Sequence, residues 1–184
     1  GTYPLPEAQV DRFMMKVLVG YPSEEEEFVI VQRVTGAAAA VSSVASTHQL
    51  LALQRECRGG YVDSSLVQYA VKLVAITREP ARHGLAEIAP YISYGASPRA
   101  SINLIEGARA LGFLRGRAYV LPQDVIDIAP DVLRHRLVLS YEALAEGKTA
   151  DDIVRRVMQH LPAPPKPLQN HVRLDAHADT AVQA

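Results

Sequence analysis

The sequence is poor in several features that would direct a search for function. It contains one cysteine, Cys57, and no tryptophan among 184 residues, so an internal disulfide is excluded and a reducing compartment is favoured. Its formal net charge of -1 gives no general affinity for nucleic acid or for an anionic membrane. No apolar run approaches the roughly 18 residues of a membrane-spanning helix. We therefore expect a cytoplasmic protein with no bound nucleic acid and no stable membrane insertion.

Two further absences concern the start of the chain and its catalytic chemistry. The chain begins at Gly1, without methionine and without a charged-then-apolar leader, so we expect a fragment that begins within a domain. It has no Gly-x-x-x-x-Gly-Lys-Ser/Thr loop to hold phosphates. No apolar strand ends in paired acidic residues that would hold magnesium, and no cysteine–histidine pattern predicts a metal site. The chain therefore lacks the residues for nucleotide hydrolysis on its own.

The patterns that are present predict a mainly α fold that follows one strand. The apolar run at 13–19 is bounded by glycine and proline, which is typical of a buried parallel strand. Ser23 and Glu26 have the spacing of a capping box, which predicts that a helix begins there. The small residues at 36–46 predict a linker with loose structure.

Five more helices are expected further along the chain, at 47–57, 63–79, 97–116, 122–133 and 149–161. Apolar residues cover a wide arc of the second of these, which predicts the central buried helix of the fold. Segments 117–120 and 137–139 are expected to form a minor strand pairing. Proline residues interrupt all regularity after 161, and residues 162–184 are expected to be a flexible or strap-like tail.

Arg99 is the first candidate for chemistry, because it follows the helix-capping Ser97 and the first-turn Pro98. A helix N-terminus has unpaired N–H groups and partial positive charge, so it attracts an anion. An arginine in that turn is unfavourable unless an anion is present. Arg99 is therefore a candidate phosphate ligand. A surface arginine that extends into water is the alternative, and it is the better interpretation of this position considered alone.

Arg12 is the second candidate, since it stands just before the expected strand and can project from the edge of a sheet domain. A salt bridge with Asp11 or Glu7 is the alternative interpretation, and it is the better one for Arg12 considered alone.

Two long blocks of sequence resemble MoxR-type AAA+ ATPases. Gly1-Thr-Tyr-Pro-Leu-Pro-Glu-Ala-Gln-Val-Asp-Arg-Phe13, with the apolar run after it, resembles the end of the ATPase core in that family. Gly95-Ala-Ser-Pro-Arg-Ala100 is the second block. Shorter blocks follow in the order of the family: Ala108-Arg-Ala110, Gly116-Arg-Ala-Tyr-Val120, Pro122-Gln-Asp-Val125 and His135-Arg-Leu137. The resemblance extends from residue 1 to about residue 140 and is most specific in the two long blocks.

The resemblance implies a homo-oligomeric ring, expected to be a hexamer, that is driven by ATP and Mg²⁺. It also implies a role in that ring for each of the two arginines. Arg12 would match the arginine finger, which reaches into the ATP site of the neighbouring subunit and stabilises the transferring phosphoryl group. Arg99 would match the second sensor, which reads the γ-phosphate of its own subunit, with Ser97 and Pro98 beside it. Family members act as chaperone-like remodelling factors, so an unknown client protein is implied as a partner. The Mg²⁺ would be held by core residues that this chain lacks.

The same resemblance implies a domain organisation. Residues 1–20 would end the α/β ATPase core with its last strand, and 21–46 would be a connecting helix and linker. Residues 47–161 would form the helical lid domain, and 162–184 the proline-rich, polar tail.

Two functions from other classes compete with this interpretation. The helices at 97–116 and 122–133 could imitate a helix-turn-helix that binds DNA, although the near-neutral charge argues against it. The broad apolar helix at 63–79 could instead provide the groove of a protein-interaction module. Neither alternative accounts for the two blocks that contain Arg12 and Arg99.

Overall fold

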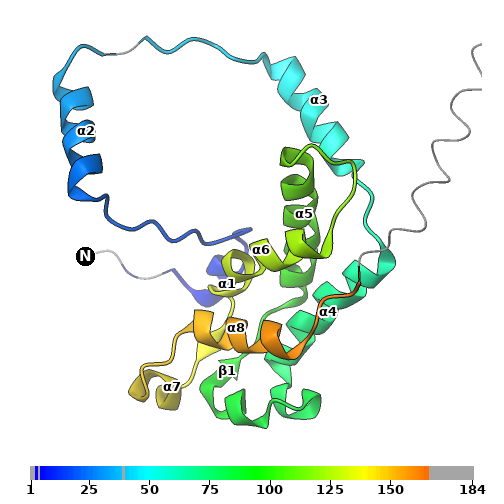
Figure 1. The fold of residues 1–184 in the computed structure, drawn as a ribbon. Coiled ribbons are helices and arrows are strands. Elements are labelled where there is room, and N and C mark those ends of the chain that lie inside the picture. The colour runs from blue at the N-terminus through cyan, green and yellow to red at the C-terminus, as the bar shows by residue number, and fades with distance from the viewer. Residues whose placement is uncertain (1–2, 4, 39, 166–184) are drawn as a thin grey trace, which may run out of the picture.

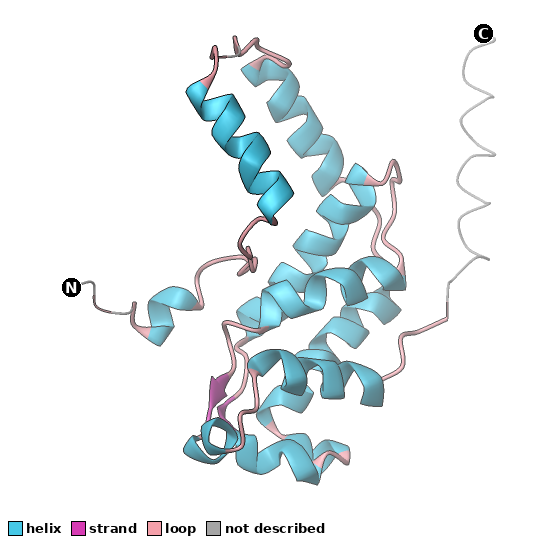
Figure 2. Cartoon of the chain, turned by 60° about the vertical axis from the view of Figure 1, so that its left-hand side comes forward, coloured by secondary structure: helices cyan, strands magenta, loops and turns pink. Residues whose placement is uncertain are grey.

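The computed structural model describes residue 3, residues 5–38 and residues 40–165. Its α-helices are α1 (Glu7–Val10), α2 (Glu24–Thr35), α3 (Thr47–Arg58), α4 (Ser64–Arg78), α5 (Pro98–Leu114), α6 (Pro122–Leu133), α7 (Tyr141–Ala145) and α8 (Ala150–His160). Two short 3-10 helices, η1 (Pro80–His83) and η2 (Ala86–Tyr91), and two strands, β1 (Ile92–Tyr94) and β2 (Val138–Leu139), complete the regular structure. The prediction of a mainly α fold is confirmed (Figures 1 and 2).

The core lies where α4, α5, α6 and α8 meet. Seven residues of α4 are buried, among them Leu66, Leu73 and Val74, each with no exposed surface. Helix α5 packs against both α4 and α6, and α8 packs against α6. The prediction that 63–79 is the central buried helix is confirmed, although Val67 and Val71 on its outer side remain exposed.

Local signals located the ends of these helices well. The capping box of Ser23 and Glu26 forms, with Ser23 N–H donating to Glu26 Oε2 over 2.9 Å. Asp63 caps α4 and Thr149 caps α8 through side-chain oxygens, as capping residues do. The predicted helix at 47–57 is capped by Ser46, whose hydroxyl accepts a hydrogen bond from the N–H of Gln49, three positions on.

The segment before α4 contrasts with the bundle. Helices α2 and α3 contain no buried residue, and the chain between α1 and α4 forms a wide open loop that carries α2 away from the core (Figure 1). Phe28, Ile30 and Val34 on α2 are all exposed. Residues 36–38 and 40–46 connect the two helices without regular structure, which agrees with the predicted linker.

The prediction of a strand at 13–19 is wrong. These residues belong to no strand, and residues 13 and 14 form a bend. Lys16 N–H donates to the Asp131 carbonyl at the end of α6 over 2.8 Å. A parallel strand forms only beside neighbouring strands, and the described part of the chain offers none at this place. The apolar run therefore lies along the helical bundle.

The predicted pairing of 117–120 with 137–139 is also wrong. Strand β2 pairs with β1 in an antiparallel arrangement, with Ile92 opposite Leu139. The 117–120 segment lies instead beside Tyr61, whose N–H donates to the Ala118 carbonyl over 2.8 Å. Both pairings join segments that are far apart in sequence, and local patterns do not specify such partners.

Two other expectations concern the outside of the bundle. Helix α6 buries six of its residues, and its exposed polar side chains include Asp127 and Gln123, so it offers no basic face to a DNA groove. Within the described residues, no helix is long and apolar enough to cross a bilayer. Residues 162–165 have no regular structure, and the rest of the predicted tail, 166–184, lies outside the described residues.

Candidate functional site

The start of α5 is fixed by a close backbone contact with the end of α4. The buried Thr77 hydroxyl accepts a hydrogen bond from Ala96 N–H at 3.0 Å and donates to the Val74 carbonyl at 2.7 Å. A Cβ atom on Gly95 would lie 2.4 Å from the Thr77 carbonyl oxygen, closer than real Cβ contacts allow. Glycine is therefore required at this position, and the turn that precedes Arg99 is held against α4.

The predicted helix start at Ser97 and Pro98 is confirmed. Ser97 Oγ accepts the backbone N–H of Arg99 at 3.2 Å, and Pro98 occupies the first turn. Arg99 thus lies in the first turn of α5, as predicted, with 53% of its side chain exposed.

Asp11 supplies the anion that the first turn of α5 requires. Its carboxylate accepts the Ser97 hydroxyl at 3.0 Å and Arg99 Nη1 at 3.1 Å, although these residues are more than 80 positions away in sequence. Burial opposes the charge of this carboxylate, but the bonds from Ser97 and Arg99 and the charge of Arg136 outweigh it. The pKa of Asp11 is therefore lowered from its ordinary value, and the group is ionised at neutral pH.

Arg136 is the buried member of the same cluster. Its side chain has no exposed surface, and its Nε lies 3.2 Å from Asp11 Oδ1. The guanidinium also donates to the carbonyls of Asp11, Phe13, Met14 and Val132. It therefore joins the end of α6 to the backbone around Arg12 through several directed bonds.

The two residues before Arg136 hold the same segment. His135 Nε2 lies 3.1 Å from the Phe13 carbonyl oxygen, and Arg134 Nη1 donates to the Lys16 carbonyl at 2.6 Å. Burial lowers the pKa of His135, so its ring is neutral near pH 7, and Nε2 carries the proton because a carbonyl only accepts. Residues 11–16 are thus fastened to the C-terminal end of α6.

Arg12 itself is exposed. Within the described part of the chain, no hydrogen bond or ion pair of its guanidinium is found, and neither Asp11 nor Glu7 forms the salt bridge that was its alternative reading. Its backbone N–H donates to the Gln9 carbonyl at 3.1 Å. The structure therefore holds the backbone of Arg12 firmly while its side chain faces outward.

A cavity of about 540 Å³ opens beside the cluster. Asp11, Ser97 and Arg136 line it, together with α1 and residues of β2. Arg99 stands at the same helix end without lining the cavity. Chemically, this place combines two guanidinium groups and a helix N-terminus, which together bind anions, with one internal carboxylate that competes for them.

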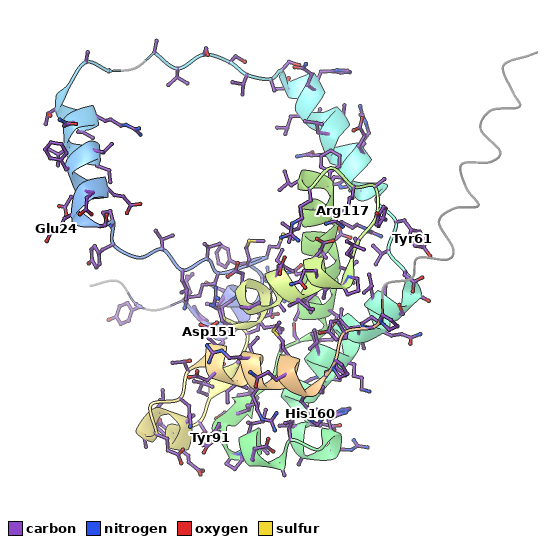
Figure 3. All side chains as sticks on the ribbon, viewed as in Figure 1. Glu24, Tyr61, Tyr91, Arg117, Asp151 and His160 are labelled. Carbon is purple, nitrogen blue, oxygen red and sulfur yellow. The ribbon has the colours of Figure 1, made fainter. Side chains whose placement is uncertain are left out.

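A second cluster of one aspartate and two arginines lies at the other end of α5. Asp124 has no exposed surface and accepts Arg115 Nη1 at 2.8 Å, both Arg117 terminal nitrogens at 2.7 Å and Leu121 N–H at 2.8 Å. Figure 3 labels Arg117 at the turn between α5 and α6. Arg115 also pairs with Asp127. Both arginines therefore have specific carboxylate partners, in addition to the negative C-terminal end of the α5 dipole.

Sequence reasoning named Arg12, Arg99, Ser97 and Pro98 and missed Asp11 and Arg136. Asp11 was considered only as a partner of Arg12, and Arg136 only as part of the block His135-Arg-Leu137. Its position in that block was the one signal that could have singled it out. In the described residues, no group of three His, Cys, Asp or Glu side chains is placed to hold a metal ion.

Comparison with known proteins gives consistent results. A family model described as the AAA lid domain matches residues 85–157. The chain is 47% identical over 164 residues to the chaperone MoxR1 of Mycobacterium tuberculosis, covering 89% of this chain and 44% of that protein. It is 39% identical to the uncharacterized protein YeaC of Bacillus subtilis, covering 89% of this chain and 49% of that protein.

A solved structure of a putative ATPase from Cytophaga hutchinsonii matches with a TM-score of 0.85 and 42% identity, over 90% of this chain and 51% of that one. The chain spans about half the length of the curated relatives it matches.

Proposed function

Because the chain belongs to the MoxR family of AAA ATPases, as a region homologous to the C-terminal half of its members, we propose that it contributes a nucleotide sensor and an arginine finger to an ATP-hydrolysing ring. The observation that carries this proposal is the joint placement of Arg99 and the Arg12 segment. One aspartate, Asp11, bonds to Arg99 and directly precedes Arg12 in the chain.

Arg99 is the proposed second sensor for the γ-phosphate of ATP bound in its own subunit. Its guanidinium is half exposed and can form charge-assisted bonds to phosphate oxygens. Ser97 and Pro98 set its position by starting α5. Support comes from the helix dipole as well, because the first turn of α5 favours an anion.

Arg12 is the proposed arginine finger, which acts on ATP in the neighbouring subunit. An arginine that serves a neighbour must extend outward from a fixed backbone, and Arg12 meets both requirements. It would stabilise charge on the transferring phosphoryl group. Without a phosphate-binding loop, this chain alone is expected to be inactive.

The wider assignments also remain proposals. The ring is expected to be a homo-oligomer of six subunits. We expect it to work in the cytoplasm and to remodel an unidentified client protein. ATP and Mg²⁺ are the proposed cofactors, and Mg²⁺ would be held by core residues outside this chain. Residues 1–20 would end the ATPase core, 21–46 would connect it to the lid, and 47–161 would be the lid domain.

ATPase kinetics of the full-length protein test these roles. Arg12→Ala is expected to lower kcat by about 10³-fold or more, with a smaller change in KM, because a finger acts in the transition state. Arg99→Ala is expected to raise KM for ATP as well as lower kcat. Arg82→Ala is the matched control, since Arg82 is an exposed arginine that also pairs with a carboxylate, Glu79. Wild-type kinetics in both the Arg12 and Arg99 variants would contradict the proposal.

A further inference from the structure

Asp11 stands between two arginines that differ greatly in freedom. Arg136 is wholly buried and is fixed by bonds to several carbonyls, whereas Arg99 is half exposed and has Asp11 as its one ion-pair partner in the described residues. The two ion pairs are nearly equal in length, at 3.1 Å for Arg99 and 3.2 Å for Arg136. The two ion pairs therefore differ in how deeply the arginine is buried and not in the distance between the charged atoms.

Burial decides which of the two pairs can exchange. An ion pair with an exposed partner contributes little, because water screens it and the side chain loses freedom in forming it. Removing a partner from a buried pair is far more costly, since it leaves an unpaired charge away from water. A phosphate group near the start of α5 would therefore take Arg99 from Asp11 and leave the pair with Arg136 intact.

We propose that Asp11 is a positioning residue that couples Arg99 to Arg12. Asp11 competes with ATP for Arg99, and when Arg99 leaves Asp11 for the phosphate, the position of the Arg12 finger changes. The coupling rests on the proposed roles of Arg12 and Arg99. The site would then be regulated by its own nucleotide, because ATP bound in one subunit changes the position of the arginine finger that this subunit extends to its neighbour.

The link from Asp11 to Arg12 is short and stiff. The two residues share a peptide bond, and Arg136 holds both the carboxylate and the backbone carbonyl of Asp11. His135 and Arg136 hold the carbonyl of Phe13 on the other side of Arg12. When Arg99 leaves, the Asp11 carboxylate keeps its bonds to Ser97 and Arg136 alone and shifts toward them. The backbone of Arg12 then shifts as well, because it directly follows Asp11 in the segment that Arg136 holds.

The first measurement is the affinity of the full-length protein for adenylyl-imidodiphosphate, a non-hydrolysable ATP analogue. Asp11→Asn retains the shape and hydrogen-bonding oxygen of the side chain but removes its charge, so it is expected to tighten binding by up to about fivefold. Glu7→Gln is the matched control, because Glu7 lines the same cavity but forms no ion pair with Arg99. The control is expected to bind like the wild type.

Two double-mutant comparisons separate coupling from mere structural support. In an Arg99→Ala background, Asp11→Asn is expected to leave analogue affinity unchanged, since the competitor has nothing left to release. In an Arg12→Ala background, it is expected to tighten binding as before but to have no further effect on kcat. In the otherwise wild-type protein, Asp11→Asn should lower kcat by about threefold or more.

Several outcomes would overturn the coupling. They are unchanged affinity in Asp11→Asn, an equal effect of Glu7→Gln, or an effect that persists undiminished in the Arg99→Ala background. Asp11→Ser removes the same charge and replaces Asp11→Asn if the asparagine variant has a lowered melting temperature. If Arg12→Ala and Arg99→Ala reduce turnover while Asp11→Asn acts additively with both, the coupling fails and the proposed function stands.

Discussion

The two clusters at opposite ends of α5 contain the same charged groups and differ in which one is buried. Near the C-terminal end, the carboxylate of Asp124 is buried and two partly exposed arginines close over it. Near the N-terminal end, Arg136 is buried, while Asp11 and Arg99 reach the surface. Each cluster joins one aspartate to two arginines, and near the C-terminal end Arg115 also pairs with Asp127. The main difference between the clusters is therefore which charged group is buried.

This difference separates a cluster that stabilises the fold from one that can respond to a ligand. Every hydrogen bond of Asp124 is short, and its carboxylate has no access to water. Losing any of its partners would therefore leave a buried charge partly unpaired, at a large cost in free energy. Asp11 can lose Arg99 to another anion at little cost because that pair is open to solvent. The comparison can be tested through the stability of this chain.

The largest effect is expected for Asp124→Ala, which should lower the free energy of unfolding by about 3 kcal/mol. The change leaves Arg117 without a carboxylate partner and Arg115 with Asp127 alone, and it removes the bond that caps α6 at Leu121. Urea unfolding followed by circular dichroism measures it. Asp152→Ala is the control, because Asp152 is half exposed but likewise pairs with an arginine, Arg155, and bonds to the N–H of the residue that caps its helix, Thr149. Equal losses in the two variants would remove the distinction.

Arg136→Ala is expected to lower the free energy of unfolding by about 2 kcal/mol. The loss is smaller than that for Asp124→Ala because the carbonyls at 11–14 that lose Arg136 can move away from α6 and form hydrogen bonds with water. The expected signature is local. Amide hydrogen exchange should quicken in residues 9–16, including the Lys16 N–H that bonds to Asp131, while α4 stays protected. A uniform loss of protection throughout the bundle would show that the segment is part of the core.

Arg99→Ala should change the free energy of unfolding by less than about 1 kcal/mol, since the pair with Asp11 is exposed. Thermal unfolding of this chain measures it beside Arg82→Ala. A large loss at Arg99 alone would mean that the pair holds the fold together, and the proposed exchange with phosphate would then be too costly.

The smallest effect is expected in acid. Burial raises the pKa of Asp124, but bonds from Arg117, Leu121 N–H and Arg115 outweigh it, so the folded pKa is lowered from 3.8. A lowered folded pKa stabilises the protein fully above the unfolded value and loses that stabilisation as pH falls through the folded value. Below about pH 4, stability should therefore fall less steeply in Asp124→Asn than in the wild type. Parallel curves from urea unfolding would contradict this.

Local chemistry explains why the helices could be predicted from the sequence. Caps such as Ser23, Asp63 and Ser97 act on N–H groups two or three residues away, so both partners fall within one short window of sequence. The long arc of apolar residues on α4 likewise reports burial directly, because its period matches the helix.

Contacts between distant segments explain what could not be predicted. The run at 13–19 has the composition of a strand, but its structure depends on whether neighbouring strands are present. Asp11 and Arg99 meet across 88 positions, and nothing near Asp11 in sequence indicates that partner. Family resemblance suggested the roles of Arg12 and Arg99, whereas their link through Asp11 required the fold.

The contact of Gly95 with Thr77 has a consequence for the rate at which the site can respond. The turn before α5 packs against the α4 backbone, and Ala96 N–H bonds to the Thr77 hydroxyl, so the backbone that precedes Arg99 is held in place. Arg99 can then change partners through its side-chain torsions. Such rotamer changes at exposed residues take picoseconds to nanoseconds, whereas collective domain motions take about microseconds to milliseconds. Exchange of Arg99 between carboxylate and phosphate should therefore be complete long before α4 and α5 have moved as a unit.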